Sequence, residues 1–315
     1  MLCPTCQAEA RKFGHDRDGN QRYQCRTCHK TFSDRPAKPL GSMRLEMDKA
    51  LQVLQLLLEG MSVRATMRVT RVNRNTILDL LVHVGDHCEM MLEDRIQKVP
   101  VKDVQVDEVW GYVFCKEKKR TDKYHGQDEI GDAYCFIGME RTTKLILAWH
   151  LGRRSTDDTH TFAHKLALAT SGEYQVTTDG FGPYRLAIPM ELEDGIAFAT
   201  LVKTYATKDD HRYSPGEVSG TIKTPCCGKV DPARICTSHV ERTNLTVRMQ
   251  DRRMTRLTNA FSKKWDNHRA SMALHFAYFN YCRVHMTLKT TPAVVAGLES
   301  RPWTLRELVE RSTQE

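Results

Sequence analysis

One stretch limits the folds open to this chain more than any other. Residues 104–114 are rich in β-branched and aromatic side chains and carry two adjacent carboxylates, Asp107 and Glu108, in their middle. This composition predicts a strand that is buried on both faces of a mixed sheet. Burial of an ionised carboxylate is unfavourable unless the group is paired or binds a metal. The stretch therefore allows two interpretations. Either the carboxylates lie near solvent or a partner cation, or one of them belongs to a functional site that the strand supports.

Size and charge set further limits. The 315 residues, 40% of them hydrophobic, suffice for a real core and for two or three domains. The formal net charge of +8 favours a polyanionic partner. Basic residues gather between positions 242 and 269, where eight lysines and arginines stand against two aspartates. This density favours contact with phosphates over an ordinary solvated face.

The cysteine content and the length of the apolar runs predict the cellular compartment of the protein. Eleven cysteines could form a disulfide scaffold, but the chain is long and does not start like a secretory signal, so we expect a reducing compartment. No apolar run approaches the roughly 18 residues that a membrane span needs. We therefore expect a soluble, cytoplasmic protein with no membrane partner.

Two CxxC pairs near the start, separated by eighteen residues, predict a metal site. Their four thiolates can complete a tetrahedral shell around Zn²⁺. A turn at residues 18–20 fits the hairpin of a zinc ribbon. The alternative is four unrelated buried cysteines. His15 and His29 are expected at the surface. We predict a zinc ribbon over residues 1–36, with a structural Zn²⁺ held by Cys3, Cys6, Cys25 and Cys28.

Residues 43–97 follow a linker rich in proline and glycine and have helical periodicity. Leucines recur at helical spacing until Gly60, Ser62 can cap a second helix, and a break at residues 70–73 precedes a third. This order predicts a helix-turn-helix DNA-binding domain. A helical packing domain without DNA contact is the alternative. The expected DNA-binding residues are Arg71, Asn73, Arg74 and Asn75.

The pattern changes to strands after Pro100 and predicts an α/β domain over residues 101–270. Three sequential strands make an antiparallel meander, and two further strands alternate with helices. We expect an RNase H-like mixed five-stranded sheet with flanking helices, a polar insert at 206–237 that forms a loop or hairpin, and a helical tail at 271–315. The predicted strands are 104–114, 132–139, 144–151, 174–178 and 196–205, and the helices between them are 155–170 and 184–190.

Three acids of this domain stand at positions that come together in an RNase H-like fold: Asp107 in the first strand, Asp179 at the end of the fourth, and Glu241 on the helix after the fifth. Two of them also have a structural interpretation. Asp179 can be a turn residue, and Ser238 with Glu241 fits a capping box. Three carboxylates supply hard oxygen ligands for two Mg²⁺ or Mn²⁺ ions, which can clamp a phosphodiester.

The helix that carries Glu241 is expected to contact DNA. Asn244 and Arg248 follow Glu241 by three and seven residues, so the three side chains share one helical face. The basic residues beyond them supply a phosphate-binding track. The expected DNA-binding residues of this segment are Arg242, Asn244, Arg248, Arg252 and Arg253.

Several blocks of the chain resemble the DDE transposases of the insertion-sequence-one type, and the likeness covers almost the whole chain. It implies that Asp107, Asp179 and Glu241 bind the catalytic ions. Glu108 is the main ambiguity, since adjacent strand residues face opposite ways and only one of the pair can face the site, and the resemblance favours Asp107. The blocks are Val106-Asp107-Glu108-Val109-Trp110, Thr178-Asp179-Gly180-Phe181, Thr237-Ser238-His239-Val240-Glu241-Arg242-Thr243-Asn244-Leu245, Phe261-Ser262-Lys263-Lys264 and Asn280-Tyr281-Cys282-Arg283-Val284-His285.

The resemblance implies a transposase of an insertion sequence. We expect residues 1 to about 95 to bind the terminal inverted repeats and the metal site to cut and join DNA strands. The implied partners are double-stranded DNA, at the element ends and the target, and further copies of the chain in a homo-oligomer. The protein would be prokaryotic and associated with the nucleoid when bound to DNA. The alternatives are a nuclease that cuts without joining and a DNA-binding regulator with vestigial acids.

Overall fold

The computed structural model describes residues 1–17, 19–33, 38–121, 124, 126–192, 195–205 and 218–313. The chain divides into two compact units, Met1–Ser42 and Met43–Thr313. Two predictions fall partly outside the described residues. Asp18 of the turn predicted at 18–20 is not described, and neither are residues 206–217, the first part of the insert predicted at 206–237. The finer boundaries predicted at 36, 97 and 270 stay predictions.

The first unit is a small antiparallel sheet. Its strands are β1 (Ala10–His15), β2 (Gln21–Cys25) and β3 (Thr31–Ser33), in the order β1-β2-β3. Apolar packing in it is sparse: the rings of Tyr23 and Phe32 stack with centroids 5.8 Å apart. A sheet this small buries too little apolar surface to be stable alone, so it needs a further cross-link.

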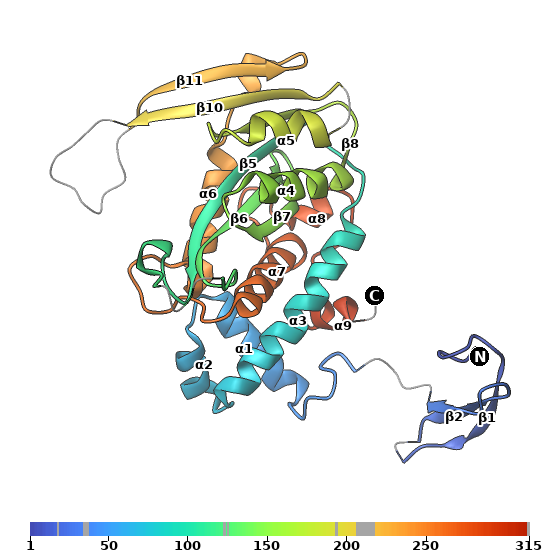
Figure 1. The fold of residues 1–315 in the computed structure, drawn as a ribbon. Helices are drawn as coiled ribbons and strands as arrows, with labels where there is room; N and C mark the ends of the chain where they lie inside the picture. Colours follow the sequence, from blue (N-terminus) through green and yellow to red (C-terminus); the bar gives the residue numbers. More distant parts are fainter. Residues whose placement is uncertain are drawn as a thin grey trace. The chain divides into compact units, whose positions relative to one another are not determined.

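The second unit begins with the three helices that the periodicity predicts: α1 (Met47–Leu58), α2 (Val63–Thr70) and α3 (Arg74–Arg95) (Figure 1). Ser62 caps α2 by accepting a hydrogen bond from the Ala65 amide at 3.2 Å. Asn73 caps α3 by accepting one from the Asn75 amide at 2.8 Å. Arg71 makes the turn between them in the left-handed region, with φ of 61°. The structure thus has three helices in the predicted segment, with a tight turn between the second and third, and a DNA-binding role for them stays a prediction.

The main sheet is mixed and has six strands rather than the five predicted. The order is β11-β10-β9-β5-β6-β7. β5, β6 and β7 form the antiparallel meander, β9 pairs parallel to β5 and β10 parallel to β9, and β11 is antiparallel to β10. The strands are β5 (Asp103–Val113), β6 (Gly131–Glu140), β7 (Ile146–Gly152), β9 (Gln175–Thr178), β10 (Ala197–Tyr205) and β11 (Val218–Cys227). A short parallel pair, β4 (Val99–Pro100) and β8 (Thr170–Ser171), lies apart from it.

The sixth strand is the part of the sheet that the sequence interpretation missed. β11 falls in the segment predicted as a loop or hairpin, and its side chains are exposed or half-buried. As an edge strand it buries no apolar face, so its sequence lacks the alternation that marks a strand, and it tolerates Pro225. Together β10 and β11 form an antiparallel ribbon.

Helices cover both faces of the sheet. Leu166 of α4 (Thr156–Ala169) packs against Gly138 of β6, whereas the next residue of β6, Met139, accepts a hydrogen bond from Thr243 of α6 (Ser238–Gln250). Adjacent strand residues face opposite ways, so α4 and α6 lie on opposite faces. Tyr184 of α5 (Tyr184–Glu191) contacts Phe136 of β6, and the Phe136 ring also stacks on Phe162 of α4, so α5 lies on the same face as α4. Short 3-10 turns, η1 (Glu117–Lys119), η3 (Pro232–Arg234) and η4 (Arg252–Met254), lie in the connections.

The C-terminal helices pack into the same core. α7 (Trp265–Tyr281) begins six residues before the predicted start of the helical tail, and Asn280 on it bonds both backbone groups of Ile146 in β7, at 3.0 and 2.9 Å. α8 (Pro292–Val295) begins at a proline, which the first position of a helix tolerates, and α9 (Leu305–Ser312) carries the capping box of Thr304 and Glu307. In the part of the chain that the structure describes, no helix is long and apolar enough to cross a membrane.

Close packing of α3 on α7 depends on Gly85. A Cβ on Gly85 would lie 2.4 Å from the carbonyl oxygen of Ala270 and 2.6 Å from its Cα. Both are backbone atoms of α7, so the helices would have to move apart.

We predict that Gly85→Ala destabilises the protein, although alanine is the better helix former by about 1 kcal/mol. Overpacking of a core by one methyl group should outweigh that gain, for a net loss of about 1–3 kcal/mol in the free energy of unfolding. Thermal unfolding of the two proteins measures this. Gly182→Ala, where an added Cβ meets nothing within 4 Å, is the control. A Gly85→Ala protein as stable as wild type would show that the helices can separate freely.

Candidate metal centres

The four cysteines of the first unit converge. Their sulfur atoms all lie within 4.8 Å of one another, with Cys3 and Cys28 3.6 Å apart and Cys6 and Cys25 3.4 Å apart. Bonds of about 2.3 Å in a tetrahedral Zn–S₄ site place sulfurs about 3.8 Å apart. The donor set and spacing therefore fit a structural zinc ion, which would supply the cross-link that this sheet needs.

The two CxxC turns have the same backbone geometry. The residue after each pair, Gln7 and His29, has a left-handed φ, of 59° and 57°. Backbone amides point at the sulfurs: the Thr5 amide donates to Cys3 at 3.4 Å and the Thr27 amide to Cys25 at 3.3 Å. Such bonds stabilise thiolates and hold metal ligands in place.

A second cluster forms in the main sheet around Asp107, Glu108 and Asp179, each of which has a carboxylate oxygen within 4.8 Å of the others. β5 pairs in parallel with β9 at Gln105 and Thr177. This register places Asp179, just past the end of β9, beside Asp107. The strand pairing therefore brings together two of the three acids that the sequence predicts, at the carboxyl end of a parallel pair, where ligands bind in α/β sheets.

Hydrogen bonds fix two of these carboxylates. Asp107 accepts from its neighbour's amide, that of Glu108, at 2.9 Å and from the side chain of Asn244 at 2.8 Å. Asp179 accepts from the Phe181 amide at 2.9 Å. The sequence interpretation assigned Asn244 to DNA, whereas the structure shows that it is buried and holds Asp107.

Gln105 positions the helix that carries Asn244. Its buried side-chain oxygen accepts hydrogen bonds from the amides of His239 and Val240, at 3.0 and 3.2 Å, which are free groups of the first turn of α6. β5 thus supplies both the acid and the group that docks α6 over it. The sequence interpretation missed this role, and a glutamine inside an apolar strand was the available signal.

Arg154 is the cation of the acid cluster. Its Nε lies 3.2 Å from Glu108 and its Nη2 lies 3.6 Å from Asp179, and its guanidinium stacks on the Phe181 ring at 4.1 Å. The side chain is 40% exposed. Arg154 comes from the loop between β7 and α4, where Asp158 anchors the chain by accepting from the Arg153 amide at 2.9 Å and from His150 at 2.7 Å. The sequence interpretation did not single it out.

The acids carry more negative charge than Arg154 offsets. Burial, and then the charges of Glu108 and Asp179, raise the pKa of Asp107 to about 7. Burial and Asp179 also raise the pKa of Glu108 to about 7, against the smaller opposing effects of Tyr184 and Arg154. Glu108 Oε1 is buried with no hydrogen-bond partner in the described part of the chain. Hard oxygen donors with surplus negative charge fit a divalent cation such as Mg²⁺ or Mn²⁺.

Glu241, the third predicted ligand, has its own partners. Lys203 of β10 contacts both of its oxygens at 2.5 Å, and the Thr237 hydroxyl donates to it at 2.7 Å. It is not one of the three acids that cluster, although its charge contributes to the raised pKa of Asp107. Its role as a metal ligand stays a prediction. The capping box predicted for Ser238 is wrong, because α6 begins at Ser238 and Thr237 precedes it as the cap residue.

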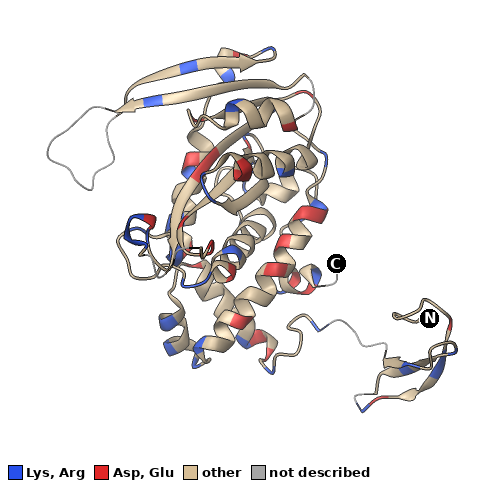
Figure 2. Cartoon of the chain, in the orientation of Figure 1, with Lys and Arg blue, Asp and Glu red and all other residues tan. Residues whose placement is uncertain are grey.

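The predicted DNA-binding residues divide into an exposed group and a group that faces the interior. Basic residues on α2 and at the start of α3 can be followed in Figure 2. In the second group, Arg248 donates to the backbone oxygens of Trp110 and Met254, both at 3.2 Å, and Arg253 donates to Ser271 at 3.1 Å. With Asn244 these two residues point inward, so their contacts are internal to the fold. The exposed members of the predicted set are Arg71, Asn73, Arg74, Asn75, Arg242 and Arg252.

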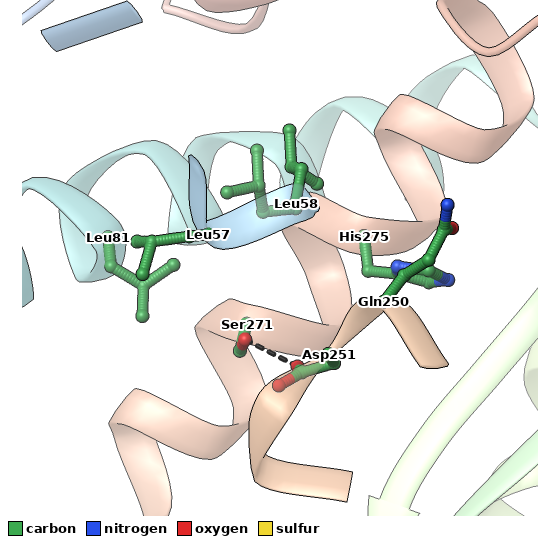
Figure 3. A pocket seen from close by; sticks show the side chains of 8 residues that line it. Leu57, Leu58, Leu81, Gln250, Asp251, Ser271 and His275 are labelled. Atoms are coloured by element: carbon green, nitrogen blue, oxygen red, sulfur yellow. Dashed lines mark hydrogen bonds between the residues drawn. The ribbon is translucent and has the colours of Figure 1, made fainter. Parts of the chain in front are cut away.

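Arg253 belongs to a polar joint between helices. Ser271 donates to the buried carboxylate of Asp251 at 2.5 Å (Figure 3), and Asp251 accepts from the Arg253 amide at 2.8 Å. The adjoining cavity measures about 10 Å³, room for roughly one water molecule, and Leu57, Leu81 and other core side chains line it. The joint ties the end of α6 to α7 and is too small for a ligand.

Comparisons with known proteins give little beyond this geometry. No protein-family model matches the chain, and no curated protein matches it. Among solved structures the chain is similar to the piggyBac transposase in a synaptic complex with hairpin DNA, with a TM-score of 0.39, 9% sequence identity, and coverage of 85% of this chain and 70% of that one. A likeness this weak does not establish a function, so a proposed function has to rest on the geometry of the site.

We predict that the first unit binds one zinc ion. The purified protein should carry about one equivalent, and Cys25→Ser should lose it because three thiolates cannot close the site. Metal analysis after exhaustive dialysis measures the content. Cys226→Ser, at an exposed cysteine outside the tetrad, should keep the zinc. Retention of zinc by Cys25→Ser would contradict the assignment.

We also predict a pH-dependent gain in stability from Asp107→Asn in metal-free buffer. In the unfolded chain this acid ionises near pH 4, whereas the folded protein raises its pKa to about 7. Ionisation therefore opposes folding increasingly as the pH rises from about 4 through 7. At pH 8 the variant should exceed wild type by about 2 kcal/mol or more, and the difference should shrink toward pH 5.

Urea unfolding in the presence of a chelator measures both proteins across this range. Asp157→Asn, at an exposed position of α4, should change little at any pH. A variant that is less stable than wild type at pH 8 would show that Asp107 is not held in an unfavourable charged state.

Proposed function

We propose that this protein is a DNA transposase of the insertion-sequence-one type, with an RNase H-like catalytic domain. The observation that carries the proposal is the parallel register of β5 and β9, which sets Asp107 beside Asp179 with Glu108 in reach. Three antiparallel strands followed by two parallel ones is the strand order expected of that fold. A cluster of half-buried acids whose charge opposes folding does not stabilise the fold, which favours a catalytic purpose.

Asp107 and Asp179 would hold the divalent ions, and Glu108 or Glu241 would complete the set. When bound, two such ions activate an attacking oxygen and stabilise the leaving oxygen of a phosphodiester in an in-line displacement. The protein's own groups orient the ligands: Asn244 and the Glu108 amide direct Asp107, and the Phe181 amide directs Asp179. Arg154, partly exposed beside both acids, is placed to contact a DNA phosphate.

Recognition of the element ends would be the role of residues 1 to about 95. The exposed Arg71, Arg74 and Asn75 stand at the turn and at the start of α3, where a recognition helix presents its first residues to DNA. Joining two ends to a target requires that copies of the chain meet on DNA, so we expect a homo-oligomer in the complex. Such a protein would work on the nucleoid of a prokaryotic cell.

The test is a strand-transfer assay with Mn²⁺ or Mg²⁺ on DNA that carries the ends flanking the gene. Asp179→Asn should lower both cleavage and joining by at least about 100-fold, because an amide is a far weaker metal ligand, while gel-shift binding to the same DNA persists. Asp157→Asn is the matched control. Glu108→Gln and Glu241→Gln decide the third ligand: the variant that loses activity without losing binding identifies it.

Each other outcome points elsewhere. Hydrolysis of the ends without joining would replace the proposal with a nuclease. Binding without cleavage by the wild-type protein would indicate a regulator. Full activity of Asp179→Asn would mean that another set of acids does the chemistry.

A further inference from the structure

A row of aromatic side chains continues from the acid cluster along β5. Trp110 and Tyr112 follow Glu108 at alternate positions, so the three side chains share one face of the strand. The ring centroids of Trp110 and Tyr112 lie 5.7 Å apart, and Phe261 extends the row at 4.8 Å from Tyr112. We call Trp110, Tyr112 and Phe261 the aromatic strip. All three side chains are half-buried, so part of each is open to solvent.

The backbone holds Phe261 in place. The segment before α7 runs beside the end of β5, where the Phe114 amide donates to the Ser262 carbonyl at 2.8 Å and Val113 bridges to Ser262. Phe261 therefore projects from a fixed segment onto Tyr112. The Phe261-Ser262-Lys263-Lys264 block, singled out in the sequence, has no other role in the site described above.

Two exposed lysines lie over the strip. The Nζ of Lys116 lies 5.4 Å from the Trp110 ring centroid and 5.8 Å from that of Tyr112, and the Nζ of Lys263 lies 3.6 Å from that of Phe261. Neither lysine makes an ion pair with a carboxylate in the part of the chain that the structure describes. Arg64 on α2 adds a further positive charge close to Lys263. The strip thus combines open aromatic surface with cations that an external anion can reach.

This combination suits one kind of ligand in particular. Phosphates alone need only lysine and arginine, and the bases of an intact duplex are hidden from a protein's aromatic rings. Aromatic faces beside cations are typical of surfaces that bind single strands, where each unpaired base can stack and each phosphate can meet a cation. The strip begins two residues from Glu108, so a strand held there would enter the acid cluster directly.

We infer that the aromatic strip binds unpaired nucleotides of a DNA end next to the acid cluster, with bases stacked on Trp110, Tyr112 and Phe261 and phosphates on Lys116 and Lys263. The inference rests on the proposed function for its location, since it assigns the strand that the acids would act on. The binding itself needs neither metal nor an intact set of acids, and this separates the two claims experimentally.

The experiment measures affinity by fluorescence anisotropy, with the full-length protein in chelator and a labelled oligothymidylate of about ten nucleotides as probe. Tyr112→Leu and Phe261→Leu keep apolar volume but remove the ring, and each should weaken binding about 5- to 100-fold, as expected for one lost stacking contact. Affinity for a duplex of equal length should change little. Tyr205→Leu, at an exposed aromatic residue at the end of β10, is the matched control.

The lysines have a separate readout. Lys116→Ala combined with Lys263→Ala should reduce the slope of log affinity against log salt concentration by about 1.4, the value for two phosphate contacts on a single strand. Lys229→Ala, an exposed lysine beyond β11, should leave the slope unchanged. Tyr112→Phe keeps the aromatic ring that Tyr112→Leu removes, so it should bind the oligothymidylate as wild type does. This comparison shows that the ring is needed for binding.

Three results would overturn the inference: wild-type affinity in both leucine variants, equal losses for single strand and duplex, or an unchanged salt slope in the double lysine variant. Capture of a peptide rather than an oligonucleotide by the strip would do the same. The outcome is independent of catalysis, because binding is measured in chelator, where no divalent ion is available to the acids and no strand is cut.

Discussion

The parallel pairing of β5 with β9 is the contact on which the rest of the second unit depends. It fixes Asp179 beside Asp107, and the same strand β5 uses Gln105 to dock α6, which in turn brings Asn244 to Asp107. The arrangement concentrates carboxylates where burial raises their pKa values. Carboxylates whose ionisation opposes folding lower the stability of the fold, and the apolar packing of α7 and the helices around it compensates for this loss.

Much of the fold follows from patterns within single elements. The run of β-branched and aromatic residues in β5, the leucine periodicity of α1 and the cap at Ser62 are local signals, and the structure confirms the elements they predict. β11 could not be predicted, because an exposed edge strand has no apolar alternation to detect. The start of α7 was placed too late, since the helix is buried on nearly all sides and carries no amphipathic period.

The candidate site was predictable only in part, for a similar reason. Asp107 and Asp179 stand at positions that any parallel pair would bring together. The cations that pair with the acids come from distant segments. Arg154, from the loop after β7, contacts Glu108 and Asp179, and Lys203 of β10 contacts Glu241. Nothing in the sequence near Arg154 or Lys203 distinguishes them from solvated cations. Likewise the inward turn of Arg253 depends on Asp251 and Ser271, which become neighbours only after α7 has packed.

The seam between α3 and α7 also governs when this protein can fold. Arg269 pairs with Asp86 across 183 positions of sequence, and Gly85 lets the two backbones touch. During synthesis the apolar face of α3 stays uncovered until α7 has also left the ribosome. Contacts of such separation form slowly and leave early intermediates prone to aggregation. A nascent chain interrupted before α7 would therefore expose the face of α3 that packs on α7.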